Sequence, residues 1–347
     1  MNKSEIEKGI SRRERVLKTL AHEPVDRVPR DIWALPGIKM NRADDYEKLL
    51  KLYPVDIAAP IFNYGTGEKQ SGTPYEIGKY VDAWGCVWHV SERGTIGEVK
   101  EPPISDLSKL GKFKPPYETI RNADLRLVNK CCAECDCFIL AGSLVRPFER
   151  LQFLRGSEVA FIDLAYGSRE IFDLIRMLHE FFMGDLKMWA KTDVDGVSMM
   201  DDWGSQTSLL ISPEMWRDIF KPLYKEYCDL LHANGKYAFF HTDGEVSKIF
   251  GELIEVGFDA INSQLFCMDL ENLAEKFAGK VTFWGEIDRQ HILPYGTPDE
   301  VRNAVRRVRK ALDNGMGGII AEAEFGLDVP IENITAVFDE WSKPRII

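Results

Sequence analysis

Short runs of apolar residues recur along the chain, and a stretch with helical character follows most of them. The runs are rich in Val, Ile and Phe, and several are apolar at every position, as in strands that are buried on both faces. Two of the intervening stretches, 212–234 and 297–312, open with Ser or Thr before Pro and an acidic residue and end near an Asn-Gly pair, which are signals of helix boundaries. The apolar runs cover residues 28–33, 55–62, 137–144, 196–200, 237–240, 260–263, 281–284 and 318–321.

Strands that alternate with helices predict a parallel sheet. Eight strand candidates favour a closed (β/α)8 TIM barrel, and a doubly wound open sheet is the alternative. The stretch from about residue 63 to 130 breaks the alternation, because it is rich in Pro, Gly, Trp and Tyr. We interpret it as an insertion after the second strand, with a small β element that folds over one mouth of the barrel. Residues 1–347, with this insertion, are predicted to form one domain, and a separate small domain for the insertion is the alternative.

Composition and charge exclude several classes of function. The chain has 347 residues, with 44 Lys and Arg against 55 Asp and Glu and a net charge of −11, so its surface should repel nucleic acid. No apolar run approaches the ~18–20 residues of a membrane span, and the charged start predicts no secretory signal. The seven cysteines show no disulfide framework, and the group between Cys131 and Cys137 is interpreted as packing. A cytoplasmic enzyme is expected.

Polar residues stand where several of the apolar runs end. If these runs are parallel barrel strands, their polar ends gather at the C-terminal mouth, which is where such barrels place their chemistry. The end groups are Asp201 and Asp202, His241 and Asp243, Glu286 and Asp288, and Glu322 and Glu324.

His241 and Asp243 are two positions apart, so on an extended strand their side chains point to the same side. Together with Glu324 they provide one imidazole and two carboxylates, a plausible ligand set for Zn²⁺ or another divalent ion. The alternative is a buried hydrogen-bonded pair that orders the loop. Cys267, a lone thiol after the sixth strand, is a weaker ligand candidate.

Other residues near the strand ends are candidates for substrate contacts. Arg146 and Arg150 follow the third strand, where they either bind carboxylates or form an ordinary ion-pair network. Trp203 follows the acidic pair of the fourth strand and is placed with them as a substrate-binding residue. Asp201, Asp202 and Glu286 are the candidates for orienting the substrate or supplying a proton.

Several motifs resemble the uroporphyrinogen decarboxylase superfamily. Residues 15–29 (RVLKTLAHEPVDRVP) resemble its N-terminal signature, and the remaining motifs resemble its methyltransferase-like branch. The likeness runs in order along most of the chain and implies a TIM-barrel fold. The further motifs are residues 82–88, 201–206, 211–216, 241–244, 285–298 and 328–333.

The sequence also departs from both branches of that superfamily. True decarboxylases carry an Arg-Gln-Ala-Gly-Arg motif that binds the substrate's carboxylates, whereas residues 30–37 here read RDIWALPG. The corrinoid-dependent methyltransferases hold zinc with His-x-Cys and a later Cys. The resemblance puts His241 at the first of these positions, Asp243 at the second and Glu324 at the third. The metal position is therefore retained with harder ligands, which suit an ether oxygen or an alkoxide.

The resemblance implies a cobalamin-linked methyltransferase, in particular one that demethylates a methyl ether. The cobalamin would come from a separate corrinoid protein, because the chain lacks the Asp-x-His-x-x-Gly cobalamin motif. Two alternatives stay open: a decarboxylase for another carboxylated substrate, and a non-catalytic protein that binds a tetrapyrrole or corrinoid. A homodimer is compatible with all three.

Overall fold

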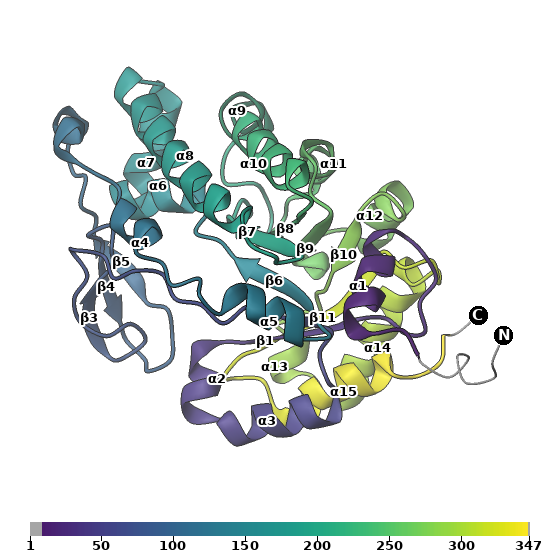
Figure 1. Ribbon diagram of the computed structural model, residues 1–347. Coiled ribbons are helices and arrows are strands. Elements are labelled where there is room, and N and C mark those ends of the chain that lie inside the picture. Colours follow the sequence, from purple (N-terminus) through teal and green to yellow (C-terminus); the bar gives the residue numbers. More distant parts are fainter. Residues whose placement is uncertain (1–8, 346–347) are drawn as a thin grey trace.

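Eight parallel strands form a nearly closed barrel in the computed structural model, which describes residues 9–345 (Figure 1). Their order around the barrel is β1-β11-β10-β9-β8-β7-β6-β2, so the predicted TIM barrel is confirmed and the open sheet is excluded. Each of the eight predicted runs overlaps one of these strands. The strands are β1 (Arg30–Ala34), β2 (Ile57–Ala58), β6 (Phe138–Gly142), β7 (Gly196–Met200), β8 (Tyr237–Thr242), β9 (Ala260–Ser263), β10 (Thr282–Trp284) and β11 (Ile319–Phe325).

Helices surround the barrel, as expected for parallel strands joined by crossover connections (Figure 1). The α-helices are α1 (Arg12–Leu20), α2 (Pro36–Asn41), α3 (Ala43–Leu52), α4 (Tyr117–Arg121), α5 (Val128–Glu134), α6 (Pro147–Arg155), α7 (Ser157–Tyr166), α8 (Arg169–Trp189), α9 (Pro213–Met215), α10 (Lys221–Ala233), α11 (Ser247–Val256), α12 (Leu270–Phe277), α13 (Ile292–Tyr295), α14 (Pro298–Leu312) and α15 (Ile331–Trp341). The 3-10 helical turns are η1 (Leu107–Lys112) and η3 (Leu265–Cys267), and η2 (Trp216–Phe220) is a π-helical turn. No helix within residues 9–345 is both long and apolar enough to cross a membrane.

The two predicted helices differ in their regularity. The stretch 297–312 forms α14, which Thr297 caps in a reciprocal arrangement with Glu300. The stretch 212–234 is helical from α9 to α10 but contains the π-helical turn η2. Pro222 lies just after this turn and has no N–H to give to the regular ladder, which explains why the helix widens there.

The barrel closes between β1 and β2 around a buried carboxylate instead of a strand ladder. The Asp56 N–H donates to the Arg30 carbonyl at 2.8 Å, and the Asp56 carboxylate accepts bonds from the Arg30 N–H and from Arg15 and Arg27. Asp56 is fully buried, so the two guanidinium groups supply the opposite charge that its burial requires. These arginines therefore belong to the N-terminal end of the barrel.

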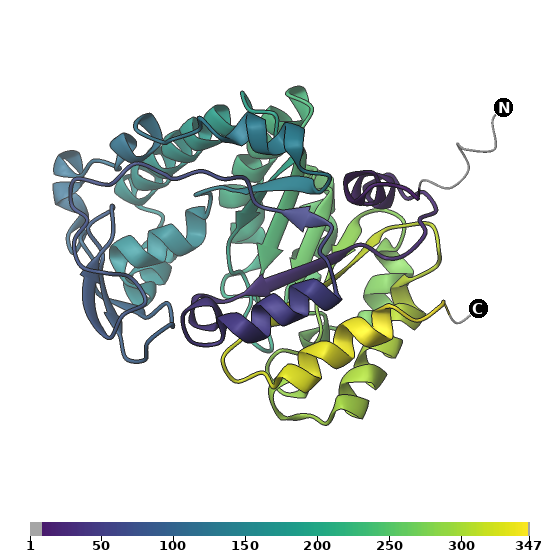
Figure 2. The same ribbon diagram turned by 60° about the horizontal axis from the view of Figure 1, so that its bottom comes forward.

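Apolar side chains fill the interior of the barrel toward its N-terminal end. Val16 and Leu20 of α1 pack into one cluster with interior residues of the strands, among them Phe138, Phe239 and Trp284. On the outside, α3 and α15 lie side by side, with the Tyr53 and Phe338 rings 5.7 Å apart (Figure 2). The interior of the barrel at this end is thus a packed core.

The segment between β2 and β6 contains a separate three-stranded antiparallel sheet of β3 (Gly78–Val81), β4 (Val87–Val90) and β5 (Glu98–Glu101). This small sheet lies at one side of the barrel (Figure 1). Arg150 of α6 fastens it there, because its guanidinium bonds the Asp82 carboxylate at 2.9 Å and lies 4.9 Å above the Trp84 ring. The hairpin between β4 and β5 reaches the barrel mouth, which is described below.

Candidate functional site

The C-terminal mouth of the barrel brings together three potential metal ligands. His241 on β8 and Asp243 just after it point to the same side, with Nε2 and Oδ1 3.5 Å apart. Asp202, which follows β7, has its Oδ1 3.7 Å from the same Nε2. One donor atom from each residue lies within 4.8 Å of the other two, a separation compatible with a common cation.

Asn262 of β9 fixes the orientation of the His241 ring. Its Oδ1 lies 2.6 Å from His241 Nδ1, while its Nδ2 donates to the Trp284 carbonyl and to Glu322. Because the amide nitrogen is committed elsewhere, Nδ1 must donate to Oδ1, which leaves Nε2, facing the two aspartates, as the ring nitrogen that a cation could bind. Metal-binding histidines are oriented by a partner of this kind.

Arg289, after β10, occupies the centre of the acidic side of the mouth. It forms ion pairs with Asp243, with Glu286 at 3.5 Å and with Glu324 at 2.8 Å. Burial opposes the charge of the guanidinium, but these carboxylates raise its pKa. One oxygen of Asp243 is thereby neutralised, while Oδ1, the oxygen facing His241, is buried without a hydrogen-bond partner.

Several titratable groups of the mouth have shifted pKa values. Burial, with the negative charges of Glu149 and Asp243, raises the pKa of Asp202 to about 7. Burial likewise raises the pKa of Glu286 to about 8 and that of Glu322 well above its usual value. Burial alone would lower the pKa of His241, but Asp243 and Asp202 raise it. Buried groups of like charge that lack enough counter-charge are typical of functional sites.

Glu324, predicted as the third metal ligand, lies outside the cluster. It is on β11 itself, because that strand continues to Phe325, and its Oε2 accepts a bond from Arg289 at 2.8 Å. Among the described residues, Asp202 takes the third position instead. Asp202, which was predicted only as a catalytic acid, therefore lies in the cluster with His241 and Asp243, and Glu324 does not.

Asp201 and Trp203 flank Asp202 in the sequence but point away from the mouth. The fully buried Asp201 carboxylate accepts bonds from the Phe148 and Glu149 N–H groups at the start of α6 and from the Tyr224 hydroxyl. Trp203 is also fully buried and stacks on Phe148 at 4.2 Å. Both residues therefore hold α6 and α10 against β7, and neither is placed to touch a substrate.

The two candidate arginines after β6 have different positions. Arg146 lies at the mouth, 3.9 Å from Glu149, and its side chain is about a quarter exposed, at 27%. Arg150 is engaged by the small sheet, as described above. Of the predicted substrate-binding residues, the structure places only Arg146 at the mouth.

An Asp201→Ala variant is expected to lower the free energy of unfolding by about 3 kcal/mol. The substitution leaves two backbone N–H groups and one hydroxyl buried without an acceptor, and each such group costs about 1–3 kcal/mol. Urea denaturation measures the change, and Asp193→Ala, at an exposed position before the same strand, is the control. Equal stability of Asp201→Ala and the wild type would contradict this structural role.

A cleft of about 790 Å³ opens beside the site. Arg289 and Glu324 form its base, and three segments form its walls: the start of α2, the β4–β5 hairpin and the loop after β11. This volume is in the range of small-molecule sites. The sequence did not single out Arg289, Asn262 or the hairpin. The only available signal was a basic residue within the 285–298 motif.

Comparisons with known proteins agree with the barrel and its motifs. A family model described as uroporphyrinogen decarboxylase (URO-D) matches residues 73–343, a region that contains all the motifs quoted above except 15–29. A methyltransferase from Methanosarcina mazei has a similar fold, with a TM-score of 0.67 at 16% identity over 96% of this chain and 98% of that chain. An endo-β-1,4-xylanase from Gloeophyllum trabeum is less similar, with a TM-score of 0.45 at 9% identity over 91% and 96% of the two chains. No curated protein sequence matches this chain.

Proposed function

This chain belongs to the uroporphyrinogen decarboxylase family, and from that premise we propose that it is a methyltransferase of the family's corrinoid-dependent branch. Its methyl donor would be a small methyl ether, and the acceptor would be a corrinoid carried by a partner protein. The Methanosarcina mazei methyltransferase, whose fold is similar over nearly the full length of both chains, supports the choice of branch.

The observation that carries the proposal is the three-donor cluster of Asp202, His241 and Asp243. Asp243 Oδ1 is buried without a hydrogen-bond partner and lies 3.5 Å from His241 Nε2, so the donor set fits a divalent cation, and zinc is the cation that we propose. Two carboxylates and one imidazole form a harder ligand set than thiolates do. When bound, the cation would supply Lewis acidity for the oxygen that leaves the methyl group.

The residues of this chain would act by position and charge. Asn262 keeps Nε2 of His241 directed inward, and Arg289 holds Asp243 in place through the oxygen that does not face the cluster. In the proposed reaction, the bond between the methyl carbon and oxygen would break and its electron pair would stay on oxygen, while the reduced corrinoid, as cob(I)alamin, would supply the electron pair for the new bond to the methyl group. Glu286, which is buried with Oε1 unpartnered, is the candidate to give that oxygen a proton.

The charge of the mouth disfavours the decarboxylase alternative. A substrate with many carboxylates needs a cationic cradle. Arg289 is already surrounded by carboxylates, and Arg146 lies next to Glu149. Arg30, which opens the stretch where decarboxylases carry their arginine motif, donates to Ser342 Oγ instead.

A methyl-transfer assay tests the proposed function. Purified protein, loaded with zinc, is mixed with cob(I)alamin and a panel of aryl and alkyl methyl ethers, and the loss of cob(I)alamin absorption is followed together with release of the alcohol. We expect loss of cob(I)alamin absorption together with release of the alcohol for at least one ether. Carbon dioxide release from a carboxylated tetrapyrrole would support the decarboxylase instead. Corrinoid binding without transfer from any donor would support a non-catalytic binding protein.

The orientation of His241 gives a separate prediction. An Asn262→Ala variant is expected to bind Zn²⁺ about 10–100 times more weakly, because the imidazole loses the partner that directs Nε2 inward. Asn262→Asp retains an acceptor for Nδ1–H, and its other oxygen, when protonated, replaces the donor to the Trp284 carbonyl or Glu322, so this variant should bind Zn²⁺ more tightly than Asn262→Ala. Competition with a zinc chelator measures both. Equal loss in the two variants would show that Asn262 acts through packing and not through Nδ1.

A further inference from the structure

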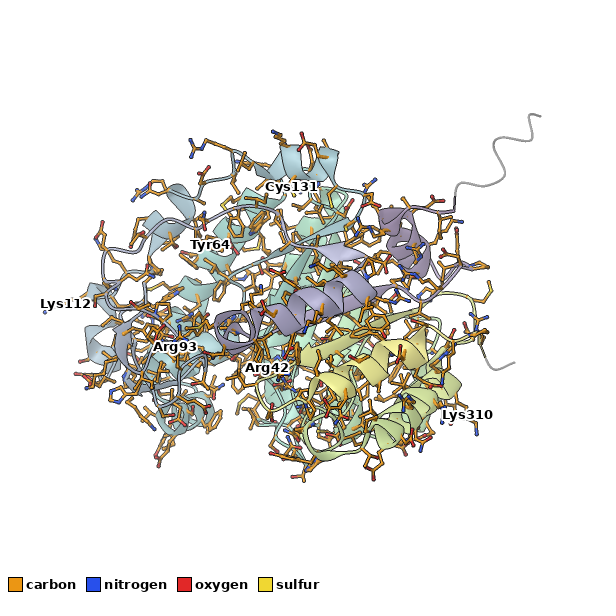
Figure 3. The ribbon with its side chains drawn as sticks, turned by 90° about the horizontal axis from the view of Figure 1, so that it is seen from below. Arg42, Tyr64, Arg93, Lys112, Cys131 and Lys310 are labelled. Atoms are coloured by element: carbon orange, nitrogen blue, oxygen red, sulfur yellow. The ribbon has the colours of Figure 1, made fainter. Side chains whose placement is uncertain are left out.

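The cleft beside the metal-ligand cluster has a fixed wall made by the β4–β5 hairpin. Gly94, at the hairpin turn, has φ +92° and approaches Gly37 of α2 so closely that an added Cβ would lie 2.4 Å from the Gly37 Cα. Arg93 next to it bonds the Asn41 side chain at 2.8 Å and pairs with Glu76. Figure 3 labels Arg93 on the hairpin and Arg42 at the end of α2. The hairpin is therefore docked onto the barrel mouth.

The walls of this cleft are largely apolar. Ile96 projects from the hairpin with 55% of its surface exposed. Burial of this apolar side chain against a ligand would be favourable. The opposite walls come from the start of α2 and from the loop after β11. Apolar groups on all three walls would remove a ligand's apolar body from water. The apolar lining residues are Leu35, Pro36, Ile96, Leu327 and Val329.

The charges of the cleft are negative overall. At its base, the single guanidinium of Arg289 is shared by Asp243, Glu286 and Glu324. The cleft is also lined by Glu92 and Asp328, both exposed, and neither side chain has an ion pair within the described part of the chain. A carboxylated ligand would be repelled by these acidic groups, and Arg289 is already paired with carboxylates of the chain. Binding of such a ligand is therefore electrostatically unfavourable.

We propose that this cleft is the binding site of the methyl donor and that it selects an uncharged donor with an apolar body, such as an aryl methyl ether. The assignment of the bound molecule as a methyl donor rests on the proposed function, but the binding preference of the cleft can be tested without it. Ile96 is then a specificity-determining residue, and Glu92 and Asp328 discriminate against carboxylated analogues of the same size.

Binding of two probes, anisole and 3-methoxybenzoate, tests the inference in the zinc-loaded protein by ligand-observed NMR, with no corrinoid present. We expect wild type to bind anisole more tightly. Ile96→Asp should weaken anisole binding by about tenfold, because a charge replaces part of the apolar wall. Ile77→Asp is the matched control, since Ile77 is 69% exposed in the same region of the chain and does not line the cleft. It should bind anisole as the wild type does.

A second variant tests the role of charge. The double substitution Glu92→Gln and Asp328→Asn should tighten 3-methoxybenzoate binding by about fivefold at low salt and leave anisole binding unchanged. Unaltered anisole binding by Ile96→Asp would overturn the inference, as would wild-type protein that prefers 3-methoxybenzoate to anisole.

The outcomes separate this inference from the proposed function. Protein that binds anisole with this pattern but transfers no methyl group to cob(I)alamin would disprove the proposed function and leave the cleft assignment intact. Methyl transfer from anisole with the same KM in Ile96→Asp as in the wild type would disprove the cleft assignment alone.

Discussion

Replacing His241 by alanine is expected to abolish tight binding of a divalent metal. His241 provides the only nitrogen of the three-donor cluster, and its Nε2 faces oxygens of Asp202 and Asp243 at 3.7 and 3.5 Å. Removing a residue that hydrogen-bonds to a metal-binding histidine already lowers metal affinity by about 10–100-fold. Removing the histidine itself should therefore lower the affinity by more than about 100-fold. Methyl transfer should fall with it.

Metal content by mass spectrometry and zinc titration measures this effect, with CD and urea denaturation to check the fold. His291→Ala is the matched control, because His291 is exposed, with a side chain that is 78% accessible, and lies outside the cluster. The spectrum of Co²⁺-substituted protein gives a readout that does not depend on activity. Equal and negligible metal in wild type and His241→Ala would disprove the metal site.

The fold was predictable because strands buried on both faces must be apolar. Each barrel strand coincides with an apolar run, and the differences occur where the environment changes. β8 continues through His241 and Thr242, and β11 through Glu322 and Glu324, because strand ends at the mouth accept polar side chains. β2 has only two residues, since it lies where the barrel closes through Asp56 and not through a ladder.

The site was predictable only in part, and alternation along a strand explains both the success and one failure. The spacing of two brought His241 and Asp243 together. The same rule separates Asp202 from Asp201 and Trp203, which point toward α6 and α10. Treating adjacent residues as one group was therefore wrong, although the sequence contained the information.

Arg289 and Asn262 could not have been identified in this way. Asn262 is followed by Ser263 at the end of the predicted run 260–263, and nothing near them in the sequence indicates that Asn262 would contact His241. The position of Arg289 depends on the loop after β10, and its three acidic partners come from the ends of β8, β10 and β11. Only the closed barrel brings these distant segments to one place, so the pattern within any one of them carries little information about the ion pairs.

Removing the guanidinium of Arg289 should make the protein depend on a metal for stability. In Arg289→Met, Asp243, Glu286 and Glu324 lose their common counter-charge, and breaking such a buried arrangement costs about 3–5 kcal/mol. A divalent cation can replace part of that charge, because the second oxygen of Asp243 becomes free to bind it. Zinc should therefore raise the Tm of this variant by more than it raises that of the wild type.

Thermal denaturation with a chelator measures the stability lost in Arg289→Met, and thermal denaturation with excess zinc measures the rise in Tm that zinc causes. Arg307→Met is the matched control, because Arg307 pairs with Glu271 on the surface, where an ion pair contributes at most about 1 kcal/mol. Its zinc-induced shift should equal that of the wild type. If zinc stabilises Arg289→Met no more than the wild type, the guanidinium and the metal do not share these carboxylates. If zinc restores the lost stability, two cations balance the acidic groups of the mouth in the wild type: the guanidinium of Arg289 and a bound metal ion.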